Sequence, residues 1–325
     1  MHVLKSQHRK LYQLAYSWDG ACLYATTETD RWGGGGVQCW QLGGDSHSVP
    51  IECAPLRAKD FATLPDGKLC VGGYRRYDED RPTGLVQVVI DPADSDAGWE
   101  LPRCNPPTRV AVSPAGDRCV VRGANRRRRA TLISYRLPLQ RSAAPEWDVS
   151  VTPQADGYSV WVAGFEFAPS GERLFSLEVT SFQRGPGQIA GRWRSAETGK
   201  TLGKPIPITG DLTLDTRLAV NGGRLIGYSK AALTSLDLTD PTAKPVRIVN
   251  GTRKHFTGIA VHPDGRRVFA TCNDETVREY DAVTLQELRA YAWKVGKLRC
   301  LAVAPDGLTA AAGSDTGKVV VWDLD

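Results

Sequence analysis

One turn sequence recurs along this chain at a nearly regular spacing, and it limits the possible folds more than any other feature. In its full form it is an apolar pair, then Pro, then Asp or a small residue, then Gly. Pro presets φ at the second position of a tight turn, and Gly accepts the left-handed conformation that closes a hairpin. Five full copies and two weaker ones follow one another at intervals of 42 to 55 residues: 18–20, 65–67, 114–116, 169–171, 221–223, 263–265 and 305–307.

Strand patterns surround these turns. Alternating apolar residues precede a turn, as in Phe165 and Phe167, and a second apolar segment follows it, as in Leu174 to Leu177. Period-two alternation is typical of a half-buried strand. Each repeat continues with a third and a fourth apolar strand segment. No segment has the apolar periodicity of a helix, so we expect an all-β chain. The third strand of each repeat ends on an aromatic or large apolar residue: Trp40, Ile90, Tyr135, Trp193, Leu236, Tyr280 and Trp322.

Four strands in a repeat of this length are typical of one propeller blade. We therefore predict a seven-bladed β-propeller of four-stranded antiparallel blades, with residues 1–325 forming a single domain. The sequence stops after the third strand of repeat seven, so that blade lacks a strand. The segment His2 to Ser6, within residues 1–8, is expected to complete it and close the ring. Closure leaves no long unpaired inner edge.

The last repeat resembles a WD (tryptophan-aspartate) repeat. It carries Gly313-Ser314-Asp315 and then a β-branched strand that ends at Trp322-Asp323, and repeat six is nearly as close, ending at Tyr280-Asp281. Repeat four has the similar ending Thr198-Gly199-Lys200 after Trp193. The likeness extends over the whole chain and is degenerate in repeats one, two and five. It implies a WD-repeat β-propeller.

The sequence also departs from the WD pattern. The Gly-His pair that usually opens a repeat is missing, with Gly251-Thr252 and Trp293-Lys294 in its place. The family's Asp six residues before the Trp corresponds to Asp274 in repeat six, but to Thr316 in repeat seven. We therefore do not expect a complete His–Ser–Asp–Trp hydrogen-bond network.

Composition excludes several classes of protein. No stretch approaches 18 apolar residues, and the first residues lack the apolar segment of a signal peptide. The eight cysteines have neither disulfide-framework nor metal-ligand spacing, so we expect reduced thiols, no bound metal, no cofactor and a cytoplasmic location. The formal charge of +5 is too small by itself to imply nucleic acid.

The first four repeats are longer than the last two. From turn Gly to closing residue they run 20, 23, 19 and 22 residues, against 15 in repeats six and seven. The extra length is expected in the hairpin between the second and third strands. Insertions in repeat architectures form loops on one face, often the binding face.

These hairpins carry basic and aromatic residues. Arg supplies forked donors for carboxylates and phosphates, and Tyr, Trp and Arg are common interface anchors. In WD-repeat proteins the connections between blades lie on the same face. The predicted partner-binding residues are Arg31, Trp32, Tyr74, Arg75, Arg76, Tyr77, Arg126, Arg127, Arg128, Arg129, Phe182, Arg184, Arg253 and Lys254. Two alternatives stay open: the arginines form a solvated turn, or the aromatic residues pack against their own loops.

The sequence therefore favours a non-catalytic scaffold that binds a protein or peptide, acidic or phosphorylated, on the face with the long hairpins. A propeller enzyme with a site at the channel mouth is one alternative, although the five histidines are scattered over different repeats. A nucleic-acid-binding module is another, although Asp78, Glu79 and Asp80 interrupt the basic loops. A third is a module of a larger assembly. The sequence implies no membrane contact and leaves the oligomeric state open.

Overall fold

The computed structural model describes residues 1–8, 10–27, 36–44, 47–51, 56–76, 82–100, 109–124, 130–140, 143–151, 159–182, 188–208, 218–221, 223–229, 231–240, 242–251 and 254–324. Within these ranges every regular element is a β-strand and no helix occurs. The same ranges accordingly contain no helix of the length and apolarity that a membrane crossing requires. The all-β prediction is confirmed.

The strands of the described residues form seven four-stranded antiparallel sheets, the blades of a propeller. Blade 1 comprises β2 (Leu11–Tyr16), β3 (Cys22–Thr27), β4 (Val37–Gln41) and β5 (Val49–Ile51). Blade 2 comprises β6 (Leu56–Thr63), β7 (Leu69–Arg76), β8 (Pro82–Asp91) and β9 (Asp94–Glu100). Blade 3 comprises β10 (Val110–Val112), β11 (Arg118–Ala124), β12 (Ala130–Arg136) and β13 (Trp147–Ser150). Blade 4 comprises β14 (Ser159–Phe167), β15 (Arg173–Ser181), β16 (Gln188–Ser195) and β17 (Thr201–Pro207).

The last three blades follow the same plan. Blade 5 comprises β18 (Leu218–Asn221), β19 (Arg224–Tyr228), β20 (Ala232–Asp237) and β21 (Val246–Val249). Blade 6 comprises β22 (Phe256–Val261), β23 (Arg267–Cys272), β24 (Thr276–Asp281) and β25 (Glu287–Ala292). Blade 7 comprises β26 (Leu298–Val303), β27 (Thr309–Ser314), β28 (Lys318–Asp323) and, from the other end of the chain, β1 (His2–Lys5).

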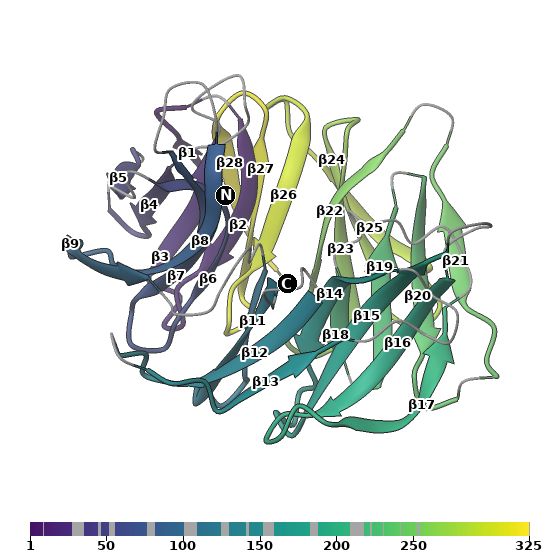
Figure 1. Ribbon diagram of the computed structural model, residues 1–325. Helices are drawn as coiled ribbons and strands as arrows, with labels where there is room; N and C mark the ends of the chain where they lie inside the picture. The colour runs from purple at the N-terminus through teal and green to yellow at the C-terminus, as the bar shows by residue number, and fades with distance from the viewer. Residues whose placement is uncertain are drawn as a thin grey trace.

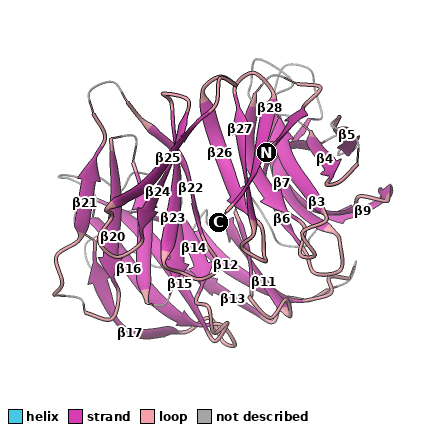
Figure 2. Cartoon of the chain, turned by 180° about the vertical axis from the view of Figure 1, so that it is seen from behind, coloured by secondary structure: helices cyan, strands magenta, loops and turns pink. Residues whose placement is uncertain are grey.

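The blades are arranged in a closed ring (Figure 1; Figure 2). The first strand of each blade contacts the first strand of the next, from β2 through β6, β10, β14, β18 and β22 to β26, and β26 contacts β2. These first strands therefore surround the central axis, and the fourth strands lie at the outer edges of the blades. The seven-bladed prediction is confirmed.

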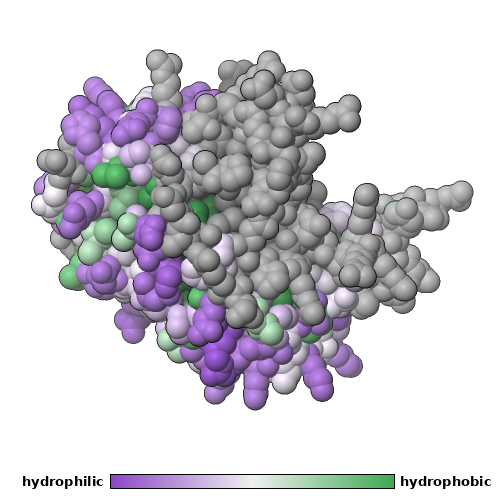
Figure 3. All heavy atoms as spheres, turned by 60° about the vertical axis from the view of Figure 1, so that its left-hand side comes forward, coloured by the Kyte–Doolittle hydropathy of each residue, from purple (hydrophilic) through white to green (hydrophobic). Residues whose placement is uncertain are grey.

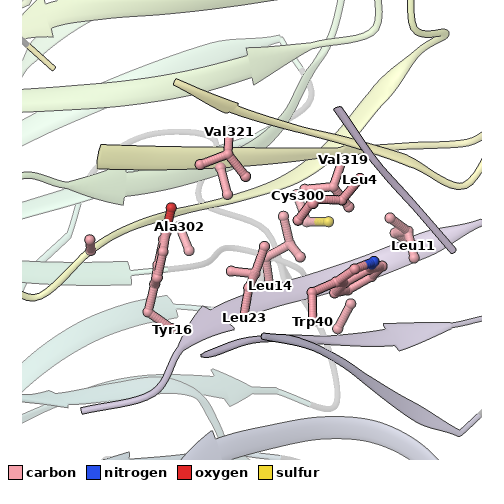
Figure 4. Packing of buried hydrophobic residues seen from close by; sticks show 13 residues of the cluster. Leu4, Leu11, Leu14, Tyr16, Leu23, Trp40, Cys300, Ala302, Val319 and Val321 are labelled. Carbon is pink, nitrogen blue, oxygen red and sulfur yellow. The ribbon is translucent and has the colours of Figure 1, made fainter. Parts of the chain in front are cut away.

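The N-terminal segment closes the ring as the sequence predicted. β1 pairs with β28, with His2 opposite Val321 and Lys5 opposite Lys318. Figure 4 shows the core between blades 7 and 1, where Leu4 of β1 packs with Val319 of β28 and with Leu11 of β2. The indole N–H of Trp40, on β4, donates to the Lys5 carbonyl at 3.1 Å. β1 therefore connects the last blade to the first.

The recurring turns lie between the first and second strands, on one face that we call the turn face. The final glycine of all seven turns has a positive φ, between 69° and 86°, as the turn prediction requires. A Cβ on Gly116 would lie 2.5 Å from Pro65 Cγ, and one on Gly307 would lie 2.8 Å from the Nε2 of His262. In both cases the contact is with the turn of the preceding blade. The turns of neighbouring blades thus pack directly against one another.

The hydrogen-bond network of the WD pattern is incomplete in blade 7, as expected. The indole N–H of the buried Trp322 has no hydrogen-bond partner among the described residues. Its ring packs instead against Trp293, with centroids 4.8 Å apart, and against Tyr291 at 5.6 Å. Aromatic packing between blades 6 and 7 takes the place of the polar network here.

A buried charged cluster lies on the second and third strands of blade 4. Glu178, only 3% exposed, accepts hydrogen bonds from Arg194 Nη2 at 2.6 Å and from Arg192 Nε at 2.8 Å. Arg194 is 4% exposed and also donates to the Ser176 hydroxyl and the Gly199 carbonyl. Beside this cluster, Trp193 stays half-buried, unlike the other six closing residues, and packs on Phe175 at 5.1 Å.

Candidate partner-binding face

The hairpins between second and third strands share a face with the connections between blades, as the WD resemblance implies. In blade 6 the backbone N–H of His255, in a connection, donates to Asn273 Oδ1 at 2.7 Å. In blade 7 the N–H of Lys297 donates to Asp315 Oδ1 at 3.0 Å. Both acceptors belong to hairpins between second and third strands. We call this the hairpin face; it lies opposite the turn face.

In blades 2 and 4 the extra length lies where the sequence predicted, in the hairpin between the second and third strands. In blade 4 the hairpin strands β15 and β16 are nine and eight residues long and pair out to Thr180 and Gln188. In blade 2, β7 and β8 are eight and ten residues long. The corresponding strands of blade 7, β27 and β28, have six residues each. The hairpin face is therefore built up most on the side of the early blades.

Most predicted binding residues lie outside the described residues: Arg31, Trp32, Tyr77, Arg126, Arg127, Arg128, Arg129, Arg184 and Arg253. Tyr74, Arg75 and Arg76 lie on β7, where the backbone of Arg75 is opposite Leu56. They lie at the hairpin end of β7, and their part in binding stays a prediction.

Two predicted residues are described with their side chains. Phe182 directly follows β15 and is half-buried. Lys254 is exposed in the connection before blade 6, and its Nζ lies 2.8 Å from Asp274 Oδ2. Arg278 contacts the same carboxylate at 3.2 Å. Lys254 is thus partly neutralised by a hairpin acid, an interaction that the sequence analysis did not predict.

The large hydrophobic side chains that the described residues expose are spread along the sequence, from Met1 to Leu308. In Figure 3 most of the coloured surface is hydrophilic, with hydrophobic side chains in small separate areas. The exposed large hydrophobic residues on outer strands belong to different blades: Val49 in blade 1, Leu202 in blade 4, Val249 in blade 5, Leu288 in blade 6 and Val3 in blade 7. Scattered single residues of this kind are normal on a protein surface.

A group of charged residues near the central axis was not predicted. Glu166 on β14 interacts electrostatically with Arg109, next to β10, and with Asp60 on β6, so three adjacent blades contribute. Burial raises the pKa of Glu166 to about 7; Asp60 adds to the rise, whereas the Phe167 backbone N–H and Arg109 oppose it. The three residues are about 50 positions apart in sequence, and only the ring brings them together.

This carboxyl group should make stability depend on pH. In the folded chain Glu166 releases its proton near pH 7, whereas in the unfolded chain it does so near 4.5. A raised folded-state pKa gives stability that is fully present below the unfolded value and is lost as pH rises through the folded value. We expect Glu166 to lower the free energy of unfolding by about 2 kcal/mol between about pH 5 and pH 8. Urea denaturation should show this loss in the wild type and not in Glu166→Gln; parallel pH profiles would contradict it.

The described residues contain no group of three or more His, Cys, Asp and Glu side chains placed to hold a metal ion. Six of the eight cysteines are described, and none of the six forms a disulfide: Cys22, Cys39, Cys70, Cys119, Cys272 and Cys300. Cys70 and Cys119 are fully buried among apolar side chains, as small hydrophobic residues would be.

Comparison with known proteins agrees with this geometry. A family model described as "WD domain, G-beta repeat" matches residues 243–281 and 284–323. Each matched segment starts with the outer strand of one blade and continues through the first three strands of the next. Among solved structures, the chain is similar to the β-propeller domain of Myceliophteria thermophila Cps50 (Swd1), with 13% identity, a TM-score of 0.66 and 100% of both chains covered. At that identity the likeness concerns the fold. No curated protein matches the chain.

Proposed function

We propose that the chain is a WD-repeat β-propeller that serves as a non-catalytic scaffold and binds an acidic or phosphorylated peptide on its hairpin face. WD-repeat propellers are typically protein-interaction scaffolds. A fold hosts many functions, however, so the choice of face and ligand has to rest on the residues of this chain.

The observation that carries the proposal is the lengthening of the early hairpins on one face. β15 and β16 in blade 4 and β7 and β8 in blade 2 extend there beyond the lengths found in blade 7. The hairpin sequences of the early blades are rich in arginine, most of all at Arg126 to Arg129 between β11 and β12 of blade 3. Arginine binds carboxylates and phosphates through two parallel hydrogen bonds. An acidic or phosphorylated peptide is the ligand that this chemistry supports best.

The cysteines bear on where in the cell the protein works. We propose a reducing, cytoplasmic location; the absence of a disulfide among the six described cysteines supports it.

The test is a binding measurement with a charge-matched control. Replacing Arg126 to Arg129 with Ala should weaken binding of a glutamate-rich peptide and of its phosphoserine version about tenfold or more, and should flatten the salt dependence. The control replaces four basic residues of the opposite face with Ala: Lys68, Arg136, Lys244 and Arg266. Because it removes the same charge, it separates a local site from the field of the whole molecule. Fluorescence anisotropy at several salt concentrations measures both effects.

Two outcomes would contradict the proposal. If the peptide affinity is the same in the wild type and the Arg126 to Arg129 variant, the peptide does not bind on the hairpin face. The same holds if the control variant loses as much affinity. Duplex DNA that binds as tightly as the peptides, with a steeper salt dependence, would favour a nucleic-acid-binding module.

A further inference from the structure

A cavity on the flank of the ring, between blades 3 and 4, has the features of an anion site. Its volume is about 480 Å³. Its lining comes from β13 of blade 3 and from β15, β16 and the start of β17 of blade 4: Val149, Ser150, Glu178, Arg192, Arg194, Lys200 and Thr201.

The lining has more positive than negative charge. It contains three basic side chains, Arg192, Arg194 and Lys200, and one carboxylate, Glu178. Both oxygens of Glu178 are already occupied, one by Arg194 and one by Arg192. One carboxylate cannot balance two arginines and a lysine, so the cavity has a net positive charge.

Donors are available for a ligand. Arg192 uses only its Nε on Glu178, and its two terminal nitrogens have no hydrogen-bond partner among the described residues. Its side chain is 20% exposed. Lys200 and Thr201 are exposed at the cavity edge, and the ammonium group of Lys200 makes no ion pair with a described residue. Two guanidinium donors, an ammonium group and a hydroxyl match the oxygens of a phosphate group.

The site is also held in place. Trp147 of blade 3 donates its indole N–H to the Ala196 carbonyl at 2.9 Å, which fixes the turn between β16 and β17. Arg194 Nη1 donates to the Gly199 carbonyl of the same turn at 3.2 Å. A Cβ on Gly199 would lie 2.6 Å from Val149, so this turn packs directly on β13. The backbone that carries the donor side chains is therefore held in place before a ligand binds, and this lowers the entropic cost of binding.

A second cavity on the other side of this turn has the opposite charge. Asp117, Glu172 and Glu197 line it, and the one basic residue of its lining, Arg118, pairs with Glu146 at 2.7 Å. An anion would be repelled there. The charge contrast restricts a phosphate ligand to the cavity of Arg192 and Lys200.

We propose that the cavity between blades 3 and 4 binds a phosphate monoester, through Arg192, Lys200 and Thr201. The site is separate from the hairpin face and does not depend on the function proposed for that face. A phosphoserine of a partner segment that crosses the flank and a free phosphorylated metabolite both present this group.

Calorimetric titration of the whole chain with inorganic phosphate and with a short phosphoserine peptide tests the proposal. Saturable binding of inorganic phosphate is expected with a Kd on the order of 1 mM. Arg192→Gln should weaken it about tenfold and Lys200→Ala about threefold. Lys204→Ala is the matched control, because Lys204 is an exposed lysine on β17 that does not line the cavity. The Ala variant of Arg126 to Arg129 should retain phosphate binding, which separates this site from the hairpin face.

The two phosphate sources give different results. A phosphoserine peptide that binds much more tightly than inorganic phosphate indicates a partner segment, and equal affinities indicate a small phosphorylated ligand. The Lys200 side chain is exposed and makes no hydrogen bond or ion pair with a described residue, so Lys200→Ala remains informative even where Arg192→Gln fails to fold. Absence of saturable phosphate binding, or binding that Lys200→Ala and Lys204→Ala weaken equally, would overturn the proposal.

Discussion

Deletion of residues 1–8 is expected to lower the free energy of unfolding by about 5 kcal/mol. The deletion removes β1, which leaves β28 as an unpaired edge in blade 7. It also removes Leu4 from the core between blades 7 and 1, and burial of one such side chain stabilises by about 1.5 to 3 kcal/mol. The Lys5 carbonyl, which accepts hydrogen bonds from Trp40 Nε1 and the Ser48 N–H, is lost as well.

Denaturant unfolding followed by tryptophan fluorescence measures this loss. Lys5→Ala serves as the control, since it alters an exposed side chain and keeps the strand backbone. A synthetic peptide of residues 1–8, added to the shortened chain, should restore part of the stability by re-forming β1. Unchanged stability after the deletion would mean that β1 does not close the ring in solution.

Glu178→Ala is expected to cost about 3 to 5 kcal/mol, because it leaves the buried Arg194 without its carboxylate partner. Arg194 would keep only its bonds to Ser176 and Gly199, neither of which carries a charge. Breaking a buried ion pair from one side is more damaging than replacing both partners. The double variant Glu178→Leu with Arg194→Met should therefore recover much of the lost stability.

Glu146 offers a matched comparison in the neighbouring blade. It also pairs with two arginines, Arg118 at 2.7 Å and Arg136 at 3.0 Å, but its side chain is 22% exposed. Water stabilises the charges that remain there, so Glu146→Ala should cost no more than about 1 kcal/mol. Equal losses for Glu146→Ala and Glu178→Ala in urea denaturation would show that burial does not set the strength of the Glu178 cluster.

The fold was predictable from sequence because its signals are local. A Pro-Asp-Gly turn such as 263–265 and the alternating strands on either side of it lie within about 20 residues, and each repeat restates the pattern. Closure by β1 was predictable because the last repeat lacks a fourth strand. The fully buried Trp40 and Tyr135 occupy the positions expected for closing residues. Trp193 differs: it packs on Phe175 with Arg173 4.9 Å above its ring, and stays half-buried.

The charged clusters could not be predicted in the same way. Glu166, Arg109 and Asp60 interact only because three blades surround one axis, and no pattern within a single repeat relates them. Glu178 and Arg194 are 16 residues apart on paired strands, at alternate positions where the polar sequence alone would suggest a face exposed to solvent. For the arginine-rich hairpins the sequence says more than the structure does. Their composition is clear in the sequence, and most of their residues lie outside the described part of the chain.

The pairing of β1 with β28 also determines where anything attached to the chain would emerge. The amino group of Met1 lies 3.7 Å from the Asp323 carboxylate, and both are at the turn-face end of blade 7. A tag, linker or neighbouring domain fused at either terminus would therefore leave the propeller on the side away from the arginine-rich hairpins. A circular permutant that joins the two ends by a short linker should likewise keep those hairpins accessible.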